Sequence, residues 1–406
     1  MKLSKLIERK SLTVLGLNSG TSADSLDMAV VKIGRAGAKK TIKILKHSEV
    51  KYPKSLKRKM DDIINSDIIT FTEFISLNNS LGKFFGKSSK KYIDKLKNDK
   101  INIDLIASHG QTIAHFPEMI NINKKKQSGT LQIGALSEIS VQTGKITVGN
   151  FRQTDIALGN EGAPITVEAM KQLLESENKP IIIVNIGGIS NFFYFPSHDN
   201  KLIAQAGDCG PGNSLTDILT QKLYNKPFDK LGEIAKTGEI SSRLLLLLIK
   251  NSQLLVNSIS TGKEVYGEKL SKQILDYSKQ LSLKNQDILA SVGEFTAQMI
   301  AKKLIPLLKS DENLLKLYLT GGGRKNKFFI DRIEANLKGI KVEPIEKIGL
   351  CGDSIEAVSY AIMGETSIRS EPMKTVFIKG KQQKILPVLG EIVQPPVIIQ
   401  PSVVMR

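Results

Sequence analysis

The feature that most constrains the fold is a pattern that occurs twice in the chain: an apolar run, a glycine-containing turn and a second apolar run. The first copy spans residues 12–33 with Gly20 in its turn, and the second spans residues 181–195 with Gly187 and Gly188 in its turn. Two apolar runs joined by a short turn are typical of a β-hairpin. Two such hairpins, a domain's length apart, predict duplicated halves that hold one polyphosphate from opposite sides.

The first turn carries groups that suit a phosphate. Gly20 permits a backbone nest of N–H donors, and the hydroxyls of Thr21 and Ser22 add further donors. Asp24 and Asp27 follow, and because carboxylates hold Mg²⁺ or its waters but repel a bare phosphate, they favour a metal nucleotide. The same residues suit an ordinary hairpin turn, so this stretch alone leaves both interpretations open.

Length and composition limit the class of protein. At 406 residues the chain exceeds the size at which one core keeps growing, so we expect two domains, residues 1–149 and 150–370, with residues 371–406 returning to the first. We find no secretory signal and no stretch long enough for a membrane span, and we expect a cytoplasmic protein. Cys209 and Cys351 are the only cysteines, which argues against a disulfide framework or a zinc site.

The net charge of +18 is the strongest compositional bias. Lysine and arginine gathered on one face would indicate a nucleic-acid partner, but the lysines here are spread over nearly every segment and rarely alternate with aromatic residues. We therefore interpret them as solvated surface and as an attraction for anionic ligands, and we do not expect nucleic acid as a partner.

A helix and a strand in the first half lead to a polar motif. Thr70 and Glu73 have the spacing of a capping box and precede apolar residues three and four apart, which predicts a helix. A strand over residues 103–107 then delivers His109 and Gln111 to its carboxyl end, where open α/β sheets bind ligands. A structural turn explains this pair equally well.

A second polar motif follows the strand over residues 146–148. Arg152 and Asp155 lie three residues apart and could simply pair on a surface turn. The glycine-containing loop that ends in Gly162-Ala163-Pro164 instead describes a rigid segment whose backbone can approach a ligand. With one fixed cation and one fixed carboxylate before it, this loop is a candidate clamp for a sugar or a carboxylate.

Asp208 is the candidate general base. It precedes Gly210-Pro211-Gly212, a loop that opens a helix whose amino terminus carries partial positive charge. A carboxylate held on a rigid loop near a phosphate can take a proton from an attacking hydroxyl or water. An aspartate in an Asx turn before glycine is the alternative.

Two motifs near the end complete the set. A strand over residues 317–320 leads into Gly321-Gly322-Gly323, whose flat backbone surface suits an adenine ring, and a helix is expected from about Asn326. Glu356 begins a last helix three residues after Asp353, a spacing that a capping box explains without any function.

Taken together and in order, these motifs resemble those of the anhydro-N-acetylmuramic acid kinases. They are Ser19-Gly20-Thr21-Ser22-x-Asp24-x-x-Asp27, His109-Gly110-Gln111-Thr112, Phe151-Arg152-x-x-Asp155, Gly162-Ala163-Pro164, Asn185-Ile186-Gly187-Gly188, Asp208-x-Gly210-Pro211-Gly212-Asn213, Ser260-Thr261-Gly262-Lys263-Glu264 and Gly321-Gly322-Gly323. Each motif is weak alone, but eight in register over residues 12–363 are specific.

The resemblance implies an α/β protein with the two-domain actin-like/sugar-kinase ATPase fold, an interdomain active-site cleft and a homodimer. It implies that ATP, with Mg²⁺, phosphorylates the 6-oxygen of 1,6-anhydro-N-acetylmuramic acid while water opens the anhydro bridge, giving N-acetylmuramic acid 6-phosphate for peptidoglycan recycling. Asp208 takes the role of catalytic base, and no metal ligands are assigned. The residues implied to bind the nucleotide are Gly20, Thr21, Ser22, Ala23, Asp24, Ser25, Leu26, Asp27, Asn185, Gly187, Gly188, Gly321, Gly322, Gly323 and Asn326. Those implied to bind the amino sugar are His109, Gln111, Arg152, Asp155, Gly162, Ala163, Pro164 and Glu356.

Several positions depart from the family pattern. Asn150 replaces an aspartate before Phe-Arg, Asn160-Glu161 replaces a Gly-Gln pair, and Ser25 replaces a glycine. Asn150 removes a charge near the expected sugar site, so the motifs define the affinity for the sugar and its identity less firmly than they define the nucleotide site. A kinase for another amino sugar or sugar acid and a non-catalytic nucleotide-dependent sensor stay as alternatives. Because Asp208 is present, we expect an active enzyme.

Overall fold

The computed structural model describes residues 3–20, 23–37, 39–64, 66, 68–122, 125–174, 180–196, 204–253, 266–310, 316–373 and 386–396. These residues form two compact units. Unit 1 contains the described residues up to Leu173 and those of segments 356–373 and 386–396, and unit 2 contains those from Leu174 to Ile355. Both units combine helices with a β-sheet, as the expected two-domain α/β kinase fold requires.

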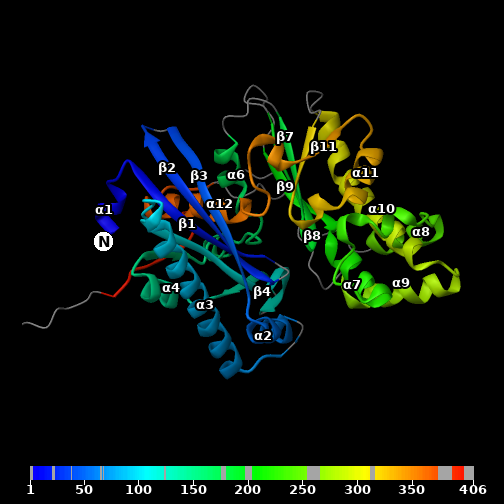
Figure 1. The fold of residues 1–406 in the computed structure, drawn as a ribbon, viewed down its shortest axis with the longest axis horizontal. Helices are drawn as coiled ribbons and strands as arrows, with labels where there is room; N and C mark the ends of the chain where they lie inside the picture. Colours follow the sequence, from blue (N-terminus) through cyan, green and yellow to red (C-terminus); the bar gives the residue numbers. More distant parts are fainter. Residues whose placement is uncertain are drawn as a thin grey trace, which may run out of the picture. The chain divides into compact units, whose positions relative to one another are not determined.

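Unit 1 is built on a seven-stranded sheet in the order β12-β6-β4-β1-β2-β3, with β5 paired to β4. Figure 1 labels the strands β1, β2, β3 and β4 of this sheet. Its strands are β1 (Ser11–Ser19), β2 (Ser25–Ala36), β3 (Lys39–Lys51), β4 (Leu105–Ile122), β5 (Lys125–Ile133), β6 (Ile146–Gly149) and β12 (Glu391–Val393). Its helices are α1 (Leu3–Ile7), α2 (Lys54–Ile64), α3 (Phe71–Asn98), α4 (Leu136–Thr143), α5 (Gln153–Ala157), α6 (Val167–Leu173) and α12 (Ile355–Ile368).

Helices cover both faces of this sheet because the side chains of β1 point alternately to either side. Leu12 and Val14 belong to a core that includes α12, whereas Leu15 and Leu17 belong to a second core with α3 and α4. A Cβ atom at Gly16 would lie 1.9 Å from the carbonyl oxygen of Ala357. Glycine at this position therefore lets α12 lie directly on β1.

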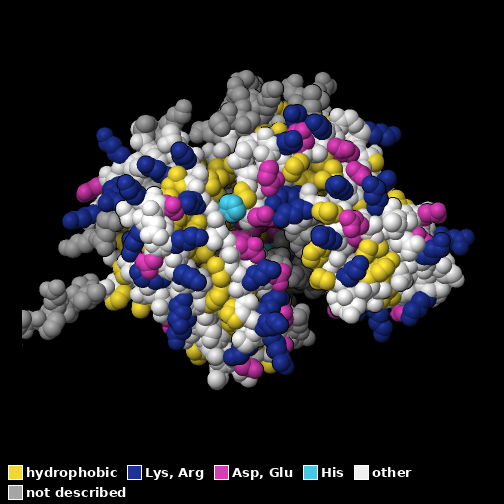
Figure 2. Space-filling view, viewed as in Figure 1, with side chains coloured by type: hydrophobic (Ala, Val, Ile, Leu, Met, Phe, Trp, Pro, Cys, Tyr) yellow, Lys and Arg dark blue, Asp and Glu magenta, His cyan; other side chains and the backbone are white. Residues whose placement is uncertain are grey.

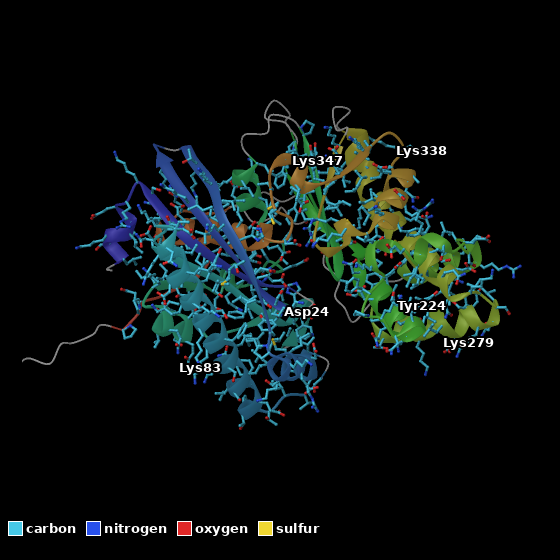
Figure 3. All side chains as sticks on the ribbon, viewed as in Figure 1. Asp24, Lys83, Tyr224, Lys279, Lys338 and Lys347 are labelled. Carbon is cyan, nitrogen blue, oxygen red and sulfur yellow. The ribbon has the colours of Figure 1, made fainter. Side chains whose placement is uncertain are left out.

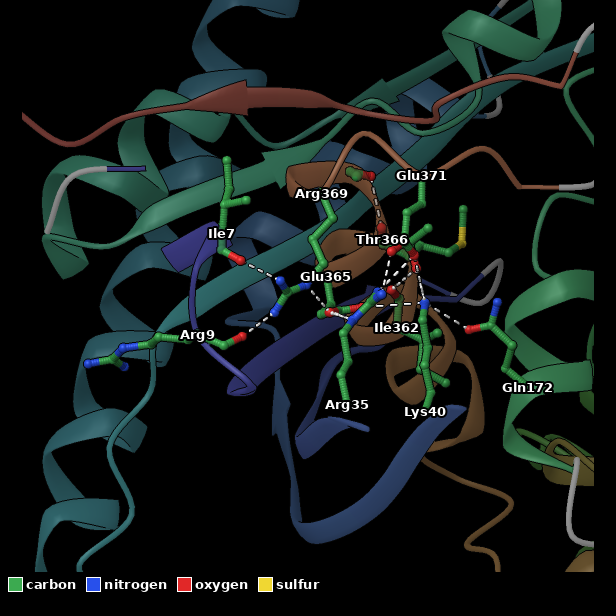
Figure 4. A network of polar contacts seen from close by, with 12 residues as sticks. Ile7, Arg9, Arg35, Lys40, Gln172, Ile362, Glu365, Thr366, Arg369 and Glu371 are labelled. Atoms are coloured by element: carbon green, nitrogen blue, oxygen red, sulfur yellow. Dashed lines mark hydrogen bonds and ion pairs between the residues drawn. The ribbon is translucent and has the colours of Figure 1, made fainter. Parts of the chain in front are cut away.

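A buried ionic network fixes the other end of α12 to the β2–β3 hairpin (Figure 4). Arg35 donates to both carboxylate oxygens of Glu365 over 2.7 and 2.8 Å, and the Glu365 side chain is completely buried. Lys40 donates to Thr366 over 2.9 Å, and Arg369 donates to the backbone carbonyl of Arg9 over 2.7 Å. Burial alone would raise the pKa of Glu365, but hydrogen bonds and charges from these cations lower it.

Unit 2 contains a five-stranded sheet in the order β11-β10-β7-β8-β9. Its strands are β7 (Ile181–Ile186), β8 (Ile189–Phe195), β9 (Gln205–Pro211), β10 (Lys316–Thr320) and β11 (Lys341–Pro344). Its α-helices are α7 (Asn213–Tyr224), α8 (Ser242–Gln253), α9 (Glu268–Gln280), α10 (Asn285–Ser310) and α11 (Lys327–Asn336), and its 3₁₀ helices are η1 (Lys230–Gly232), η2 (Ala235–Thr237), η3 (Gly322–Lys325) and η4 (Ile345–Ile348). One core joins the sheet to α10 and α11, and a second joins α7, α8, α9 and α10.

The division of the chain differs from the expected boundary at 149 and 150. Phe151, Ile165 and Ala169 lie in the core that includes α12, so the first unit continues to Leu173. Helix α12 was expected in the second half but packs in unit 1. The segment 386–396 also lies in unit 1, where β12 pairs antiparallel with β6.

On the face in Figure 2, Lys and Arg side chains are scattered among Asp, Glu and uncharged side chains and do not gather in one patch. None of the helices formed by the described residues is long and apolar enough to cross a membrane.

Candidate functional site

The first predicted phosphate site is the turn between β1 and β2, near Asp24 (Figure 3). The two strands pair antiparallel with Asn18 opposite Asp27, which confirms the expected hairpin. The left-handed backbone conformation in this turn occurs at Ala23, with φ of 51°, and not at Gly20 as the nest argument supposed. The Ala23 N–H donates to the Gly20 carbonyl over 3.0 Å and closes the turn. Thr21 and Ser22 lie outside the described residues.

The hairpin offers carboxylates and packing residues. The Asp24 side chain is 63% exposed and lies 3.6 Å from the Lys57 ammonium, whereas Ala23 and Leu26 pack their side chains into the core. Only the backbone of Ala23 and Leu26 is therefore available to a ligand. Within the described residues, no three His, Cys, Asp or Glu side chains gather into a metal site. Such a turn suits Mg²⁺ held largely by phosphates and water, for which one or two carboxylates suffice.

A buried polar layer supports the end of β1. The Ser19 hydroxyl donates to Gln111 Oε1, and the Tyr52 hydroxyl donates to Ser19 Oγ over 2.7 Å. Gln111 is fully buried on β4, which continues past the expected strand end at residue 107. Gln111 therefore holds β4 against β1 and does not present its side chain to a ligand. Beside this layer, Asn18 Nδ2 donates to Glu356 Oε2 over 2.7 Å.

Arg152 and Asp155 both hold the loop at Gly162. Arg152 Nη1 donates to the Gly162 carbonyl over 2.7 Å, and the Gly162 N–H donates to Asp155 Oδ2 over 2.9 Å. The second Asp155 oxygen accepts from Asn160 Nδ2 over 2.9 Å. The two charged side chains thus hold one segment of the protein's own backbone, and Asp155 is buried. These contacts do not test whether the loop clamps a sugar or a carboxylate.

His109, in its neutral form, orients the Arg152 side chain. Its ring stacks on Tyr360 of α12 with centroids 4.6 Å apart, and its Nε2 accepts from Arg152 Nε over 2.9 Å. The proton therefore lies on Nδ1, which donates to the Gly110 carbonyl over 3.2 Å. Burial first, and the Arg152 charge second, lower the pKa of His109 well below its usual value. His109 is a fixed hydrogen-bonding group and not a proton carrier at neutral pH.

A cavity of about 180 Å³ opens next to His109 within unit 1. Its polar lining comes from Asn78, His109, Gln132 and Asn150, and its apolar lining includes Phe74 and Leu136. No Asp, Glu, Lys or Arg is among the described residues that line it, and His109, which does line it, is neutral. Asn150, where the sequence interpretation expects an aspartate in the family, contributes an uncharged amide to the wall of this cavity.

Unit 2 places Asp208 in a row of polar residues across its sheet. Asn185 on β7 lies opposite Asn191 on β8, and Asn191 lies opposite Asp208 on β9, so the three side chains share one face. Asp208 is half-buried on a strand and not on the expected loop. Burial first, and the Asp208 charge second, raise the pKa of Tyr266 to about 12.

The second hairpin caps α7. The N–H groups of Asn213 and Ser214 donate to the carbonyls of Gly187 and Gly188 over 2.7 and 3.2 Å. A Cβ at Gly212 would lie 2.3 Å from the Gly187 carbonyl oxygen, so this approach requires glycine. Because these N–H groups are engaged, the start of α7 is less available to a phosphate than the sequence argument supposed.

The triple-glycine turn packs against the end of β7. A Cβ at Gly321 would lie 2.3 Å from Asn185 Oδ1, and one at Gly323 would lie 2.3 Å from the Ile186 side chain. A Cβ at Gly322 would meet only Asn213 Nδ2, at 3.6 Å, which is an ordinary van der Waals distance. Packing therefore explains Gly321 and Gly323, whereas it does not require glycine at position 322.

Comparison with known proteins identifies the family. The sequence profile of the anhydro-N-acetylmuramic acid kinase family matches residues 12–394. A protein of Pseudoalteromonas translucida named anhydro-N-acetylmuramic acid kinase is 33% identical over 375 residues, which cover 92% of this chain and 93% of that protein. One of the same name from Caldanaerobacter subterraneus subsp. tengcongensis is 32% identical and covers 90% and 93%.

The chain belongs to this family. Among solved structures, the activator of 2-hydroxyisocaproyl-CoA dehydratase from Clostridium difficile with bound ADPNP is similar to it with a TM-score of 0.39 and 12% identity. That likeness covers 88% of this chain and 96% of the activator.

For a kinase of this family, each unit gathers part of the predicted set. Unit 1 brings together His109, Arg152, Asp155 and the Gly162 loop, and it places Glu356 on Asn18. Unit 2 brings together Asn185, Asp208, the second hairpin and the triple-glycine turn. Asn326 caps α11 by accepting from the Phe329 N–H over 3.2 Å. The motif over residues 260–264 lies outside the described residues.

The sequence interpretation missed two residues of these clusters. Asn18 holds Glu356, and Asn191 stands between Asn185 and Asp208 with an amide oxygen that is buried and without a hydrogen-bond partner among the described residues. Asn18 comes directly before Ser19 at the end of β1, and Asn191 comes directly after Ser190 near the start of β8. Their places beside the glycine-containing turns were the available signal.

Proposed function

We propose that the protein is an ATP-dependent kinase that hydrolyses the 1,6-anhydro bond of 1,6-anhydro-N-acetylmuramic acid and phosphorylates the freed 6-oxygen. The product is N-acetylmuramic acid 6-phosphate, which suits a role in peptidoglycan recycling. The family match over residues 12–394 carries this proposal. Asp208, on the same sheet face as Asn185 beside the triple-glycine turn, supports it.

Asp208 is the proposed base. The bridged sugar has no free 6-hydroxyl, so a water must attack the anomeric carbon and release the 6-oxygen. Asp208 takes one proton of that water as its oxygen bonds to the anomeric carbon and the bond to the 6-oxygen breaks. The released 6-oxygen then bonds to the γ-phosphorus of ATP, and ADP leaves.

The nucleotide is proposed to bind the first hairpin at residues 20–27, the turn at Gly187 and Gly188, and the triple-glycine turn. Gly322 supports this assignment because it leaves room for a flat ring. Asn185 and Asn326 act by shaping the turn and starting α11. Bound Mg²⁺ neutralises phosphate charge, and Asp24 and Asp27 are the carboxylates that the first hairpin offers it.

The amino sugar is proposed to bind the Gly162-Ala163-Pro164 loop, which Arg152 and Asp155 clamp, with His109 behind Arg152. The uncharged cavity at Asn150 suits a neutral group of the sugar such as an amide or hydroxyl. Glu356 and Gln111 support the site through Asn18 and Ser19. We further propose that the enzyme is a cytoplasmic homodimer.

Mass analysis of the product formed from ATP and the anhydro sugar in ¹⁸O-labelled water tests the reaction. We expect one phosphate and one ¹⁸O atom in the sugar, with the label at the anomeric carbon. A phosphorylated sugar without the label indicates a different sugar kinase. A screen of other amino sugars and sugar acids for ADP release then identifies its substrate.

A further inference from the structure

Arg324 folds back onto the triple-glycine turn that it follows. Its side chain is only 5% exposed, and Nη1 donates to the Gly321 carbonyl over 2.9 Å. The Arg324 backbone N–H donates to the same carbonyl over 3.3 Å. One residue therefore closes the turn with both its main chain and its side chain.

The guanidinium also binds the segment that leads into α12. Nη1 and Nη2 donate to the two oxygens of Asp353 over 2.7 Å each, and Nε donates to Glu346 Oε1 over 2.9 Å. A Cβ at Gly352 would lie 2.6 Å from Arg324 Nε, so glycine is needed where the side chain passes. The hydrogen bonds from Arg324 lower the pKa of Asp353 despite its partial burial. The Arg324 guanidinium and the Asp353 carboxylate thus form an ionised, bidentate pair.

We propose that Arg324 is a positioning residue for the nucleotide, which holds the Gly321–Gly323 turn in its binding shape by anchoring it to Asp353. The inference rests on the proposed nucleotide-binding role of these glycines. Consecutive glycines have wide conformational freedom, and ordering them at the moment of binding would reduce affinity. A turn that is already fixed by Arg324 avoids that cost.

Replacing the Arg324 guanidinium by an ammonium group tests whether the bidentate pair holds the Gly321–Gly323 turn. Lysine keeps the charge but cannot make the bidentate pair, so we expect R324K to weaken ADPNP binding, measured by calorimetry, about tenfold. The kcat at saturating ATP should stay within about twofold, because the turn regains its shape once the nucleotide is bound. D353N should cause a similar loss. The double variant should lose no more than either single one, because both changes remove the same contact.

Two variants in the same unit serve as controls. Lys325 also contacts Asp353, over 3.3 Å, but is 60% exposed, so K325A should leave ADPNP affinity unchanged. Arg332 binds the buried Glu294 away from the turn, so R332K should lower thermal stability without weakening ADPNP binding.

Unchanged ADPNP affinity in R324K, or losses that add in the double variant, would overturn the inference. Equal weakening in R332K would also overturn it, because the effect would then report stability alone. A protein that binds ADPNP with this pattern but makes no phosphosugar would overturn the proposed reaction and leave the role of Arg324 intact. A protein that binds no ADPNP would overturn both.

Discussion

Asp208 is the single residue on which the proposed chemistry depends most. Replacing it with asparagine keeps its size and removes the base, so we expect kcat to fall by about 10³-fold. ATP binding should change little, because the triple-glycine turn and both hairpins remain. Steady-state kinetics with ATP and the anhydro sugar, together with ADPNP calorimetry, check this. Asp331, an exposed carboxylate on α11, gives the matched control D331N. A D208N protein with normal turnover would remove Asp208 from the mechanism.

Residue-scale interpretation found the motif positions but not always their roles. Gln111 and Asn326 were assigned to ligands, but the structure uses Gln111 to bind Ser19 and Asn326 to cap α11. Sequence spacing cannot distinguish these uses, because a buried amide and a ligand-binding amide have the same local sequence. Arg152 and Asp155 were predicted either to pair on a surface turn or to form part of a ligand clamp. In the structure both side chains bind the Gly162 backbone, which neither prediction included, and the ligand clamp stays a prediction.

At the scale of elements, the contact between β1 and α12 depends on Gly16. Alanine there would place a Cβ 1.9 Å from the Ala357 carbonyl oxygen, so α12 would have to move. We expect G16A to lower the free energy of unfolding by about 2 kcal/mol or more, measured by urea denaturation. Sugar affinity should also fall, because Asn18 and Glu356 separate. Gly144 has φ of 65° and open space around it, so G144A should cost only about 1 kcal/mol. Equal losses in the two variants would contradict this account.

The ionic network at the other end of α12 should make stability depend on pH. E365Q leaves Arg35 and Lys40 without their buried partner, and we expect a loss of about 3 kcal/mol. Because the pKa of Glu365 is lowered in the folded protein, the pair stabilises fully above the ordinary glutamate pKa of about 4.3 and less as the pH falls below it. The melting temperature should therefore fall less between pH 7 and pH 3.5 in E365Q than in the unmodified protein. D94N, at an exposed pair, should change stability by less than about 1 kcal/mol.

Most elements could be predicted from local patterns, but their assignment to units could not. Both hairpins are confirmed, and so is the capping box of Thr70 and Glu73 at the start of α3. Helix α12 was assigned to the wrong half because its apolar pattern does not say which sheet it covers. That information lies in two close contacts between elements that are far apart in the sequence. Gly16 of β1 packs against α12, and Gly364 of α12 packs against β4.

At the scale of the whole molecule, the net charge of +18 should favour anionic ligands. Raising NaCl from about 50 to 500 mM shortens the range of this field, so we expect the KM for ATP to rise several-fold. Adenosine, which lacks the phosphates, should inhibit with a Ki that does not change with salt. Equal salt responses of ATP and adenosine would show that the charge does not act on the nucleotide. Retention on immobilised duplex DNA at 150 mM NaCl would contradict the expectation of no nucleic-acid partner.

The described residues of unit 2 lie in the chain between Leu173 and Glu356, and they separate the two main segments of unit 1. During synthesis on a ribosome, the amino-terminal sheet emerges long before the helix that fills one of its faces. An apolar surface of that sheet must wait, uncovered, until α12 has been translated. Unit 2, whose described elements form a single uninterrupted stretch of sequence, can complete its core first. We therefore expect unit 2 to complete its core before unit 1 does.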